Sequence, residues 1–215
     1  GRTEESLEIR RELLPVMQRV LGADHAHTLT MAANLGASLD SLGRHAEAVE
    51  LFTEVARGLA DSLGAQHSTT LYWRAVLAYE LDAVGRTDEA RELIDETVRL
   101  AAALDEPLSS DMIEIRYMHA ALLSRWGRFE EALAELEPSI APLIAARGLQ
   151  SPRTQKALLA IADNAVALGR DEVAAGRLRQ ASAGGNDFSE LSEFPRLAAM
   201  KASGELDRLV GKPGG

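Results

Sequence analysis

Apolar residues recur along the chain at intervals of three and four, the spacing that places them on one face of an α-helix. In the first clear example they are Leu29, Ala32, Leu35, Leu39 and Leu42, with polar residues filling the positions between them. The pattern predicts a helix over about 28–42 and, after a short break at Gly-Arg, a second helix over about 45–63.

This pair of helical patterns returns every 42 residues, as four Gly-Arg dipeptides show: Gly43-Arg44, Gly85-Arg86, Gly127-Arg128 and Gly169-Arg170. Seven positions before each glycine stands Gly or Ala, and five positions after it stands Ala. Four positions beyond each alanine comes a large apolar residue: Phe52, Ile94, Leu136 and Leu178. Glycine ends a helix readily in the left-handed conformation. Each unit is therefore predicted to be a helical hairpin whose open apolar flank is covered by the next hairpin.

The small residue, the alanine twelve positions later and the large apolar residue four positions beyond it resemble the tetratricopeptide repeat (TPR) pattern. The 42-residue period and the run from Leu21 to Leu29, which leads into Asn34-Leu35, are similar to the kinesin-light-chain subtype. The resemblance covers about residues 1–181. It implies an all-α fold, a right-handed α-solenoid of antiparallel helix pairs. The chain departs from the pattern at residues 105–108 and at Val173, which replaces a glutamate.

The start of the chain is in phase with the repeat, because Gly1-Arg2 lies one period before Gly43-Arg44. We expect a half repeat over 1–20, then about four repeats to 181, a linker over 182–195 and a C-terminal capping helix and tail over 196–215. A solenoid that begins on the second helix of a repeat exposes an apolar face. We therefore expect a C-terminal piece of a longer protein, and such arrays resemble the C-terminal TPR regions of larger bacterial signalling and regulatory proteins.

The composition, net charge and motifs of the chain argue against several classes of function. The absence of cysteine excludes disulfides and cysteine-based metal or catalytic sites. A net charge of −10 argues against nucleic-acid binding by this segment. No apolar run reaches the roughly 20 residues of a membrane span, and no signal segment begins the chain, so we expect a cytoplasmic protein without a membrane partner. Phosphate-binding and hydrolase motifs are absent, so we expect no enzyme and no cofactor.

The resemblance also implies a ligand groove, lined by the first helix of each repeat at fixed distances from its small residue. All three tyrosines fall at such positions, and tyrosine suits recognition because it combines apolar area with one hydroxyl. The alternative is that amphipathic tyrosines merely cover half of a helix surface. The predicted partner-binding groove consists of Asn34, Ala37, Asp40, Tyr72, Val76, Tyr79, Asp82, Glu114, Tyr117, Met118, Arg125, Lys156 and Asp163.

Histidines and arginines offer weaker candidates. His25 and His27 have a spacing that could bind a metal, but His67 repeats His25 one period later, which favours a helix-start position fixed by the repeat. We therefore expect no metal site. His119, at an otherwise apolar position, is either a hydrogen-bonded buried imidazole or a pH switch. The four Gly-Arg arginines could form an anion-binding ladder, but their place just past a helix C-terminus favours a structural role.

Two functional hypotheses follow. In the first, the chain is a protein–protein interaction scaffold that binds a peptide or a helix of a partner in the concave groove. In the second, the array regulates its own protein intramolecularly or self-associates, without a separate peptide ligand.

Overall fold

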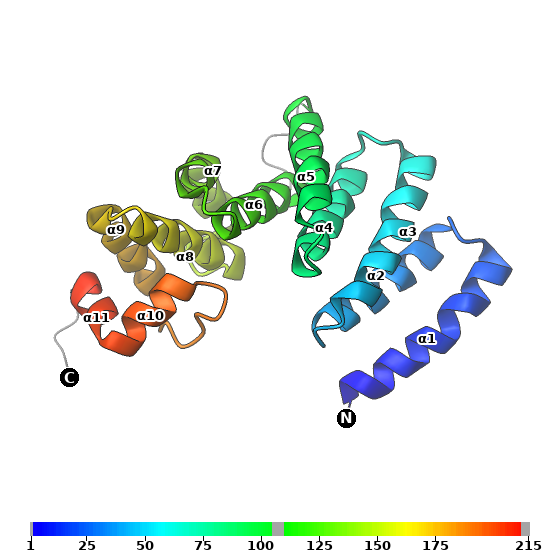
Figure 1. The fold of residues 1–215 in the computed structure, drawn as a ribbon, viewed down its shortest axis with the longest axis horizontal. Helices are drawn as coiled ribbons and strands as arrows, with labels where there is room; N and C mark the ends of the chain where they lie inside the picture. Colours follow the sequence, from blue (N-terminus) through cyan, green and yellow to red (C-terminus); the bar gives the residue numbers. More distant parts are fainter. Residues whose placement is uncertain (1, 105–109, 212–215) are drawn as a thin grey trace. The chain divides into compact units, whose positions relative to one another are not determined.

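The computed structural model describes residues 2–104 and 110–211, with helices throughout and no strand within these ranges (Figure 1). The departure at 105–108 and the tail beyond 211 lie outside them. The helices are α1 (Arg2–Leu21), α2 (Ala26–Asp40), α3 (His45–Leu63), α4 (Ser68–Ala83), α5 (Thr87–Ala102), α6 (Ser110–Arg125), α7 (Phe129–Arg147), α8 (Pro152–Ala167), α9 (Asp171–Ala183), α10 (Pro195–Ser203) and α11 (Glu205–Val210). The predicted all-α fold is confirmed.

The chain divides into two compact units, residues 1–118 and 119–215, and the boundary falls within α6. In the first unit each helix packs on the next one along the chain, from α1 to α5. In the second unit α8 packs between α7 and α9, and the C-terminal helices add to this core because α10 packs on α8 and α11 on α9. Successive helices therefore pair as in an α-solenoid.

The Gly-Arg turns have the geometry that the sequence predicted. Gly43, Gly85, Gly127 and Gly169 all have positive φ, between 65° and 81°. The arginine N–H that follows each glycine donates back to a carbonyl in the last turn of the preceding helix, as from Arg44 N to Leu39 O at 2.9 Å. This bond closes the first helix before the second begins. In the first repeat, α2 runs from 26 to 40, two residues ahead of the predicted span at both ends.

The repeated small and large apolar residues form the core. Ala48, Ala90, Ala132 and Ala174 are fully buried. The close approach predicted at Gly36 is confirmed, since a Cβ atom there would lie 2.6 Å from Cε1 of Phe52. Bulk at this position would push α2 and α3 apart.

Three of the four repeated arginines form ion pairs with their side chains. Arg86 pairs with Glu89 at 2.6 Å and Arg128 pairs with Glu131 at 2.6 Å, in each case with the glutamate three residues on. Arg44 and Glu47 make the same contact. The glutamate that Val173 replaces in the fourth repeat is thus the partner of the turn arginine.

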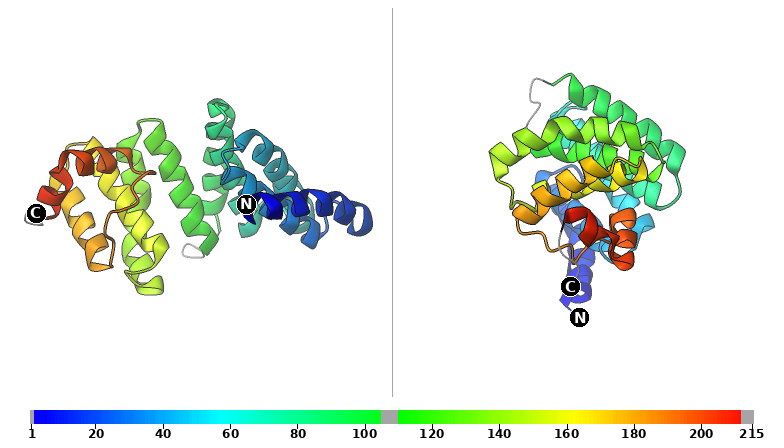
Figure 2. Two further views of the ribbon diagram at one scale, coloured as in Figure 1. Left: turned by 90° about the horizontal axis from the view of Figure 1, so that it is seen from below. Right: turned by 90° about the vertical axis from the view of Figure 1, so that its left-hand side faces the viewer.

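The segment expected as a linker packs against the second unit. We call residues 184–194 the C-terminal strap; Figure 2 shows it as an extended segment between α9 and α10. Its side chains Phe188, Leu191 and Phe194 are buried. The capping helix expected beyond 196 is two helices, since Gly204 adopts a left-handed conformation between α10 and α11.

Candidate functional site

The predicted groove residues of the first unit lie at solvent-facing positions of the first helices of the repeats. In α2, Asn34, Ala37 and Asp40 are exposed, while the residues between them contribute to the core. In α4 and the start of α6 the predicted residues are half-buried: Tyr72, Val76, Tyr79, Asp82, Glu114, Tyr117 and Met118. These ten residues therefore share the first unit, and each leaves part of its surface open to solvent.

An aromatic row connects this surface to the core. The ring of Tyr72 stands edge-on to Trp73, with 5.2 Å between centroids. Trp73 in turn lies 5.5 Å from Phe52, which is buried in α3. Tyr72 is therefore held against a rigid support, and a supported aromatic ring loses little conformational freedom when it binds a partner.

A polar triad, Asp40, His45 and Glu80, lies where α2, α3 and α4 meet. Nδ1 of His45 lies 3.0 Å from a carboxylate oxygen of Glu80 and 3.4 Å from one of Asp40. The Glu80 side chain is only 4% exposed, and this burial raises the pKa of its carboxyl above the ordinary 4.5, against the hydrogen bond from His45, which lowers it. The triad joins the end of α2, the start of α3 and the last turn of α4 to one another.

Sequence reasoning identified Asp40 but missed its two partners. The available signal was the repeat register: Glu80 stands where Leu122 stands one period later, so a carboxylate occupies a core position. The three ligand atoms of the triad lie within 4.8 Å of one another, close enough to hold a divalent cation. The contact of His45 with both carboxylates accounts for the same arrangement without an ion.

One period later the positions of Asp40 and His45 are held by Asp82 and Thr87, which also contact each other. Asp82 takes the place of Asp40 and accepts a hydrogen bond from the Thr87 hydroxyl at 3.1 Å. Both aspartates thus join the end of a first helix to the start of the second helix, in addition to facing solvent. Their carboxylates make this surface of the first unit acidic.

The remaining predicted residues lie in the second unit, and two of them contact the C-terminal segment. Asp163 is 2% exposed and accepts the N–H groups of Arg196 and Leu197 at 2.8 and 3.0 Å, so it caps the start of α10. Its other oxygen pairs with the Arg196 guanidinium at 2.7 Å. Lys156 pairs with Glu193 of the strap at 2.7 Å. Arg125 is exposed at the end of α6. The chain itself therefore covers Asp163, while the Lys156 side chain stays 44% exposed beside the strap.

Comparison with known proteins agrees with this architecture. Residues 1–61 match the family model of the tetratricopeptide repeat. This match spans α1, α2 and most of α3. No curated protein sequence matches it.

Solved structures show the same fold over nearly the whole chain. The Q17M form of nearly identical TPR-like repeats from a putative kinesin light chain of Podosopora anserina has a TM-score of 0.68 and 23% identity, covering 86% of this chain and 87% of its own. BtubC (BKLC) from P. vanneervenii has a TM-score of 0.67 and 18% identity, covering 98% of this chain and 85% of its own. The predicted α-solenoid fold of kinesin-light-chain-like repeats is thereby confirmed.

The repeated histidines begin helices, as the sequence predicted. Nδ1 of His25 accepts the N–H of His27 at 3.2 Å, and Nδ1 of His67 accepts the N–H of Thr69 at the same distance. Each is thus the N-cap of a first TPR helix. His119 is half-buried, and its Nδ1 lies 3.8 Å from the Glu135 carboxylate. None of the helices in the described part of the chain combines the length and apolarity that crossing a membrane requires.

Proposed function

We propose that the first unit binds a peptide or a helix of a partner protein through a tyrosine face. We define this face as Asn34, Ala37 and Asp40 of α2, Tyr72, Val76, Tyr79 and Asp82 of α4, and Glu114, Tyr117 and Met118 of α6. The observation that carries the proposal is the half-burial of all three tyrosines of the chain on this set of positions.

The chemistry of the face indicates the kind of segment that it suits. Tyr72, Val76 and Met118 offer apolar area, while Asp40, Asp82 and Glu114 offer carboxylates. A complementary segment combines an apolar anchor with one or more basic residues. Buried tyrosine contacts account for a large share of the energy in such interfaces, whereas exposed charges mainly set the association rate and specificity.

The test is selection of binding peptides from a displayed library against the full chain, followed by affinity measurement on variants. Combining Tyr72→Ala, Tyr79→Ala and Tyr117→Ala is expected to weaken the selected peptides at least about 100-fold, since each hot-spot residue contributes about 2 kcal/mol. Glu54→Ala with Glu92→Ala, at exposed positions of α3 and α5, is the matched control and is expected to change the affinity little. Undiminished binding by the triple tyrosine variant would refute the tyrosine face.

A second candidate function, self-association, rests on a separate observation in α1. Ile9, Leu13, Val16 and Val20 follow the helical spacing and are 60%, 41%, 42% and 72% exposed. One period later Val55 takes the place of Leu13, and it is only 1% exposed. Such an apolar stripe suits a second copy of the chain.

Sedimentation velocity over a range of concentrations tests this candidate. Self-association through α1 predicts a mass that rises with concentration in the unchanged chain and stays monomeric after Ile9→Lys with Val20→Lys. A monomer at every concentration would exclude it. Membership of a larger bacterial regulator stays a prediction, which the sequence of the whole gene checks.

A further inference from the structure

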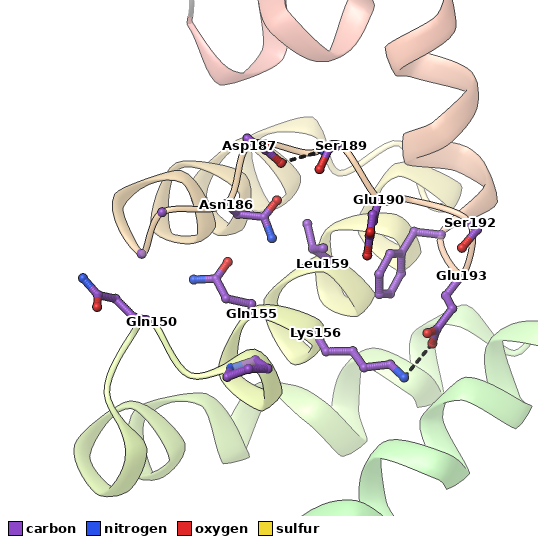
Figure 3. A pocket seen from close by; sticks show the side chains of 14 residues that line it. Gln150, Gln155, Lys156, Leu159, Asn186, Asp187, Ser189, Glu190, Ser192 and Glu193 are labelled. Carbon is purple, nitrogen blue, oxygen red and sulfur yellow. Dashed lines mark hydrogen bonds and ion pairs between the residues drawn. The ribbon is translucent and has the colours of Figure 1, made fainter. Parts of the chain in front are cut away.

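A polar pocket lies between α8 and the C-terminal strap, apart from the tyrosine face. It has a volume of about 480 Å³, within the range of small-ligand sites. Figure 3 shows Gln155 and Lys156 entering it from α8, with Asn186 and Glu190 facing them from the strap. All of these residues belong to the second unit, so the pocket is formed within one compact body.

The floor of the pocket contains a hydrogen-bond acceptor without a partner. Gln155 is 8% exposed, and its Nε2 donates to Leu149 O at 2.6 Å. Because the amide nitrogen is committed to that carbonyl, the orientation of the amide is fixed. Its oxygen, Oε1, is buried and accepts no hydrogen bond. A buried acceptor left unsatisfied costs about 1–3 kcal/mol, so this atom favours a ligand that brings an N–H or O–H donor.

The local packing keeps that acceptor in place. A Cβ atom added to Gly184 would lie 2.1 Å from Nε2 of Gln155 and 2.6 Å from Leu149 O. The amide is therefore confined between the backbone of Gly184 and the carbonyl of Leu149. A pre-positioned acceptor binds a donor without first losing side-chain entropy.

The strap adds negative charge to the pocket. Asp187, Glu190 and Glu193 line it, and Lys156 is the one basic residue among its lining side chains. Lys156 already contacts Glu193, so the lining carries two further carboxylates, Asp187 and Glu190, of which Asp187 also interacts with the charge of Lys201. Hydrogen bonds from Ser189 lower the pKa of Asp187, so this carboxyl stays ionised well below neutral pH. The charge favours a cation as the donor.

An apolar wall completes the pocket. Leu159 and Phe194 line it beside the acidic residues, and both are buried. Arginine and lysine side chains combine an alkyl stem, which packs on such a wall, with a cationic head that donates several hydrogen bonds. A bare metal ion would make no use of the apolar wall.

We propose that this pocket binds a long basic side chain, with the alkyl stem against Leu159 and Phe194 and the cationic head on Gln155 Oε1 and the strap carboxylates. The shared chemistry is an alkylguanidinium or alkylammonium group, and we assign its source to an arginine or lysine residue of a partner polypeptide. The site is independent of the tyrosine face and stands even if that face binds nothing.

The experiment is isothermal titration of the full chain with acetyl-Gly-Gly-Arg-Gly-Gly-amide and with the same peptide containing citrulline, a neutral isostere of arginine. We expect the arginine peptide to bind at least 10-fold more tightly and to lose affinity as salt increases. In NMR spectra the side-chain amide signals of Gln155 are expected to move with the arginine peptide alone. Equal affinity for the two peptides would overturn the cation site.

Variants separate the pocket from general electrostatic attraction. Asp187→Asn with Glu190→Gln is expected to weaken the arginine peptide at least 5-fold, and Lys156→Gln to strengthen it about 2- to 5-fold because the cation that competes for Glu193 is removed. Glu172→Gln, an exposed acid on α9 outside the pocket, is the matched control with unchanged affinity. An effect of Glu172→Gln as large as that of the pocket variants would refute a defined site.

Two further measurements test whether the ligand comes from a polypeptide and whether the pocket binds it independently of the tyrosine face. Agmatine, a free alkylguanidine, is expected to bind more weakly than the peptide, and equal or tighter binding would overturn the assignment to a polypeptide. The triple tyrosine variant is expected to bind the arginine peptide as well as the unchanged chain does. A loss of binding there would overturn the pocket as the site.

Discussion

Helices α4 and α8 are the first helices of their repeats, and each has 16 residues. Their predicted groove positions nevertheless differ in residue type and in their contacts with the rest of the chain. Lys156 and Asp163 of α8 stand 84 residues, two periods, after Tyr72 and Tyr79 of α4. In α4 these positions are half-open tyrosines. In α8 they are charged groups that bind Glu193 and Arg196 of the same chain. A change of residue type at two positions thus accompanies the attachment of the C-terminal segment to α8.

The residues next to these positions differ in the same sense. Gln155 and Asn164 of α8 replace Leu71 and Glu80 of α4, and all four are buried. Leu71 belongs to an apolar core, whereas Gln155 is buried because Gly184 and the strap pack on it. The repeat pattern thus determines which positions of α4 and α8 correspond, while the polarity of the residues there determines whether another segment of the chain packs on them.

Among these substitutions, removal of the Asp163 carboxylate is expected to have the largest effect on stability. Asp163→Ala leaves two N–H groups and a guanidinium without their acceptor, at an expected cost of about 2–4 kcal/mol. Hydrogen exchange should then speed up in the strap and α10. Tyr79→Ala, at the matching position of α4, is the control and should leave exchange in its own unit nearly unchanged. Equal protection of 184–203 before and after Asp163→Ala would show that the strap does not depend on this carboxylate.

A methyl group at Gly184 tests whether the cover of α8 is closely packed. Gly184 has negative φ, so backbone conformation does not forbid alanine, but its Cβ would overlap Gln155 and Leu149. Gly184→Ala is expected to lower the free energy of unfolding by about 1–3 kcal/mol through overpacking. Gly176→Ala is the matched control, since a Cβ there meets nothing within 4 Å, and it should raise stability by up to about 1 kcal/mol through helix propensity. Urea unfolding followed by circular dichroism measures both, and a neutral Gly184→Ala would contradict the close packing.

Much of the fold could be predicted from the sequence because its determinants are local and repeated. Ala48 and Ala90 are buried small residues in phase, and Gly43 and Gly85 end helices in phase, so each period confirmed the others. The solvent-facing positions of α2 and α4 followed from the same register. What binds there is a property of side chains outside the repeat pattern, so the tyrosine face stays a proposal.

The C-terminal cover was missed because it depends on contacts between residues far apart in the sequence. Asp163 and Arg196 are 33 positions apart in the sequence. The sequence alone does not distinguish a buried aspartate from an exposed one. The strap also lacks a helical run, since Asn186 and Asp187 accept the N–H groups of Phe188 and Ser189 in Asx-type turns at its start. Segments rich in Gly, Asn and Asp normally indicate loops, and only the packing shows that this loop buries its apolar side chains.

A pH titration tests the difference between Glu80 of α4, which is titratable, and Asn164 at the matching position of α8, which is not. Burial raises the pKa of Glu80 above 4.5 in the folded chain. Between 4.5 and the raised value the folded state binds the proton more tightly, so the free energy of unfolding falls as pH rises through that interval. Glu80→Gln removes this contribution. Glu89 and Glu131 have lowered pKa values and therefore make stability depend on pH in the opposite direction. Both groups are present in the variant as well, so their contribution cancels when the urea midpoints of the two proteins are subtracted at each pH.

The expected difference curve shows the unchanged chain losing stability relative to Glu80→Gln as pH rises above 4.5, and then a plateau. Asn164→Asp supplies the matched experiment in the second unit, since a new carboxyl buried at this position should acquire the same sign of pH dependence. Parallel curves for the unchanged chain and Glu80→Gln would mean that Glu80 titrates alike in the folded and unfolded states.

The smallest expected effect comes from restoring the missing ion pair of the fourth turn. Arg170 has nearly the backbone conformation of Arg86, with φ −92° against −84°, but Val173 stands where Glu89 pairs with Arg86. Val173 is 39% exposed, so a glutamate fits there without burial. Val173→Glu is expected to add about 0.3–0.5 kcal/mol, the contribution of an exposed helical ion pair. A double-mutant cycle with Arg170→Ala separates the pair from the better helix propensity of glutamate. A coupling energy of zero would show that the repeated Arg–Glu contact of the first three turns is a consequence of the repeat geometry rather than a source of its stability.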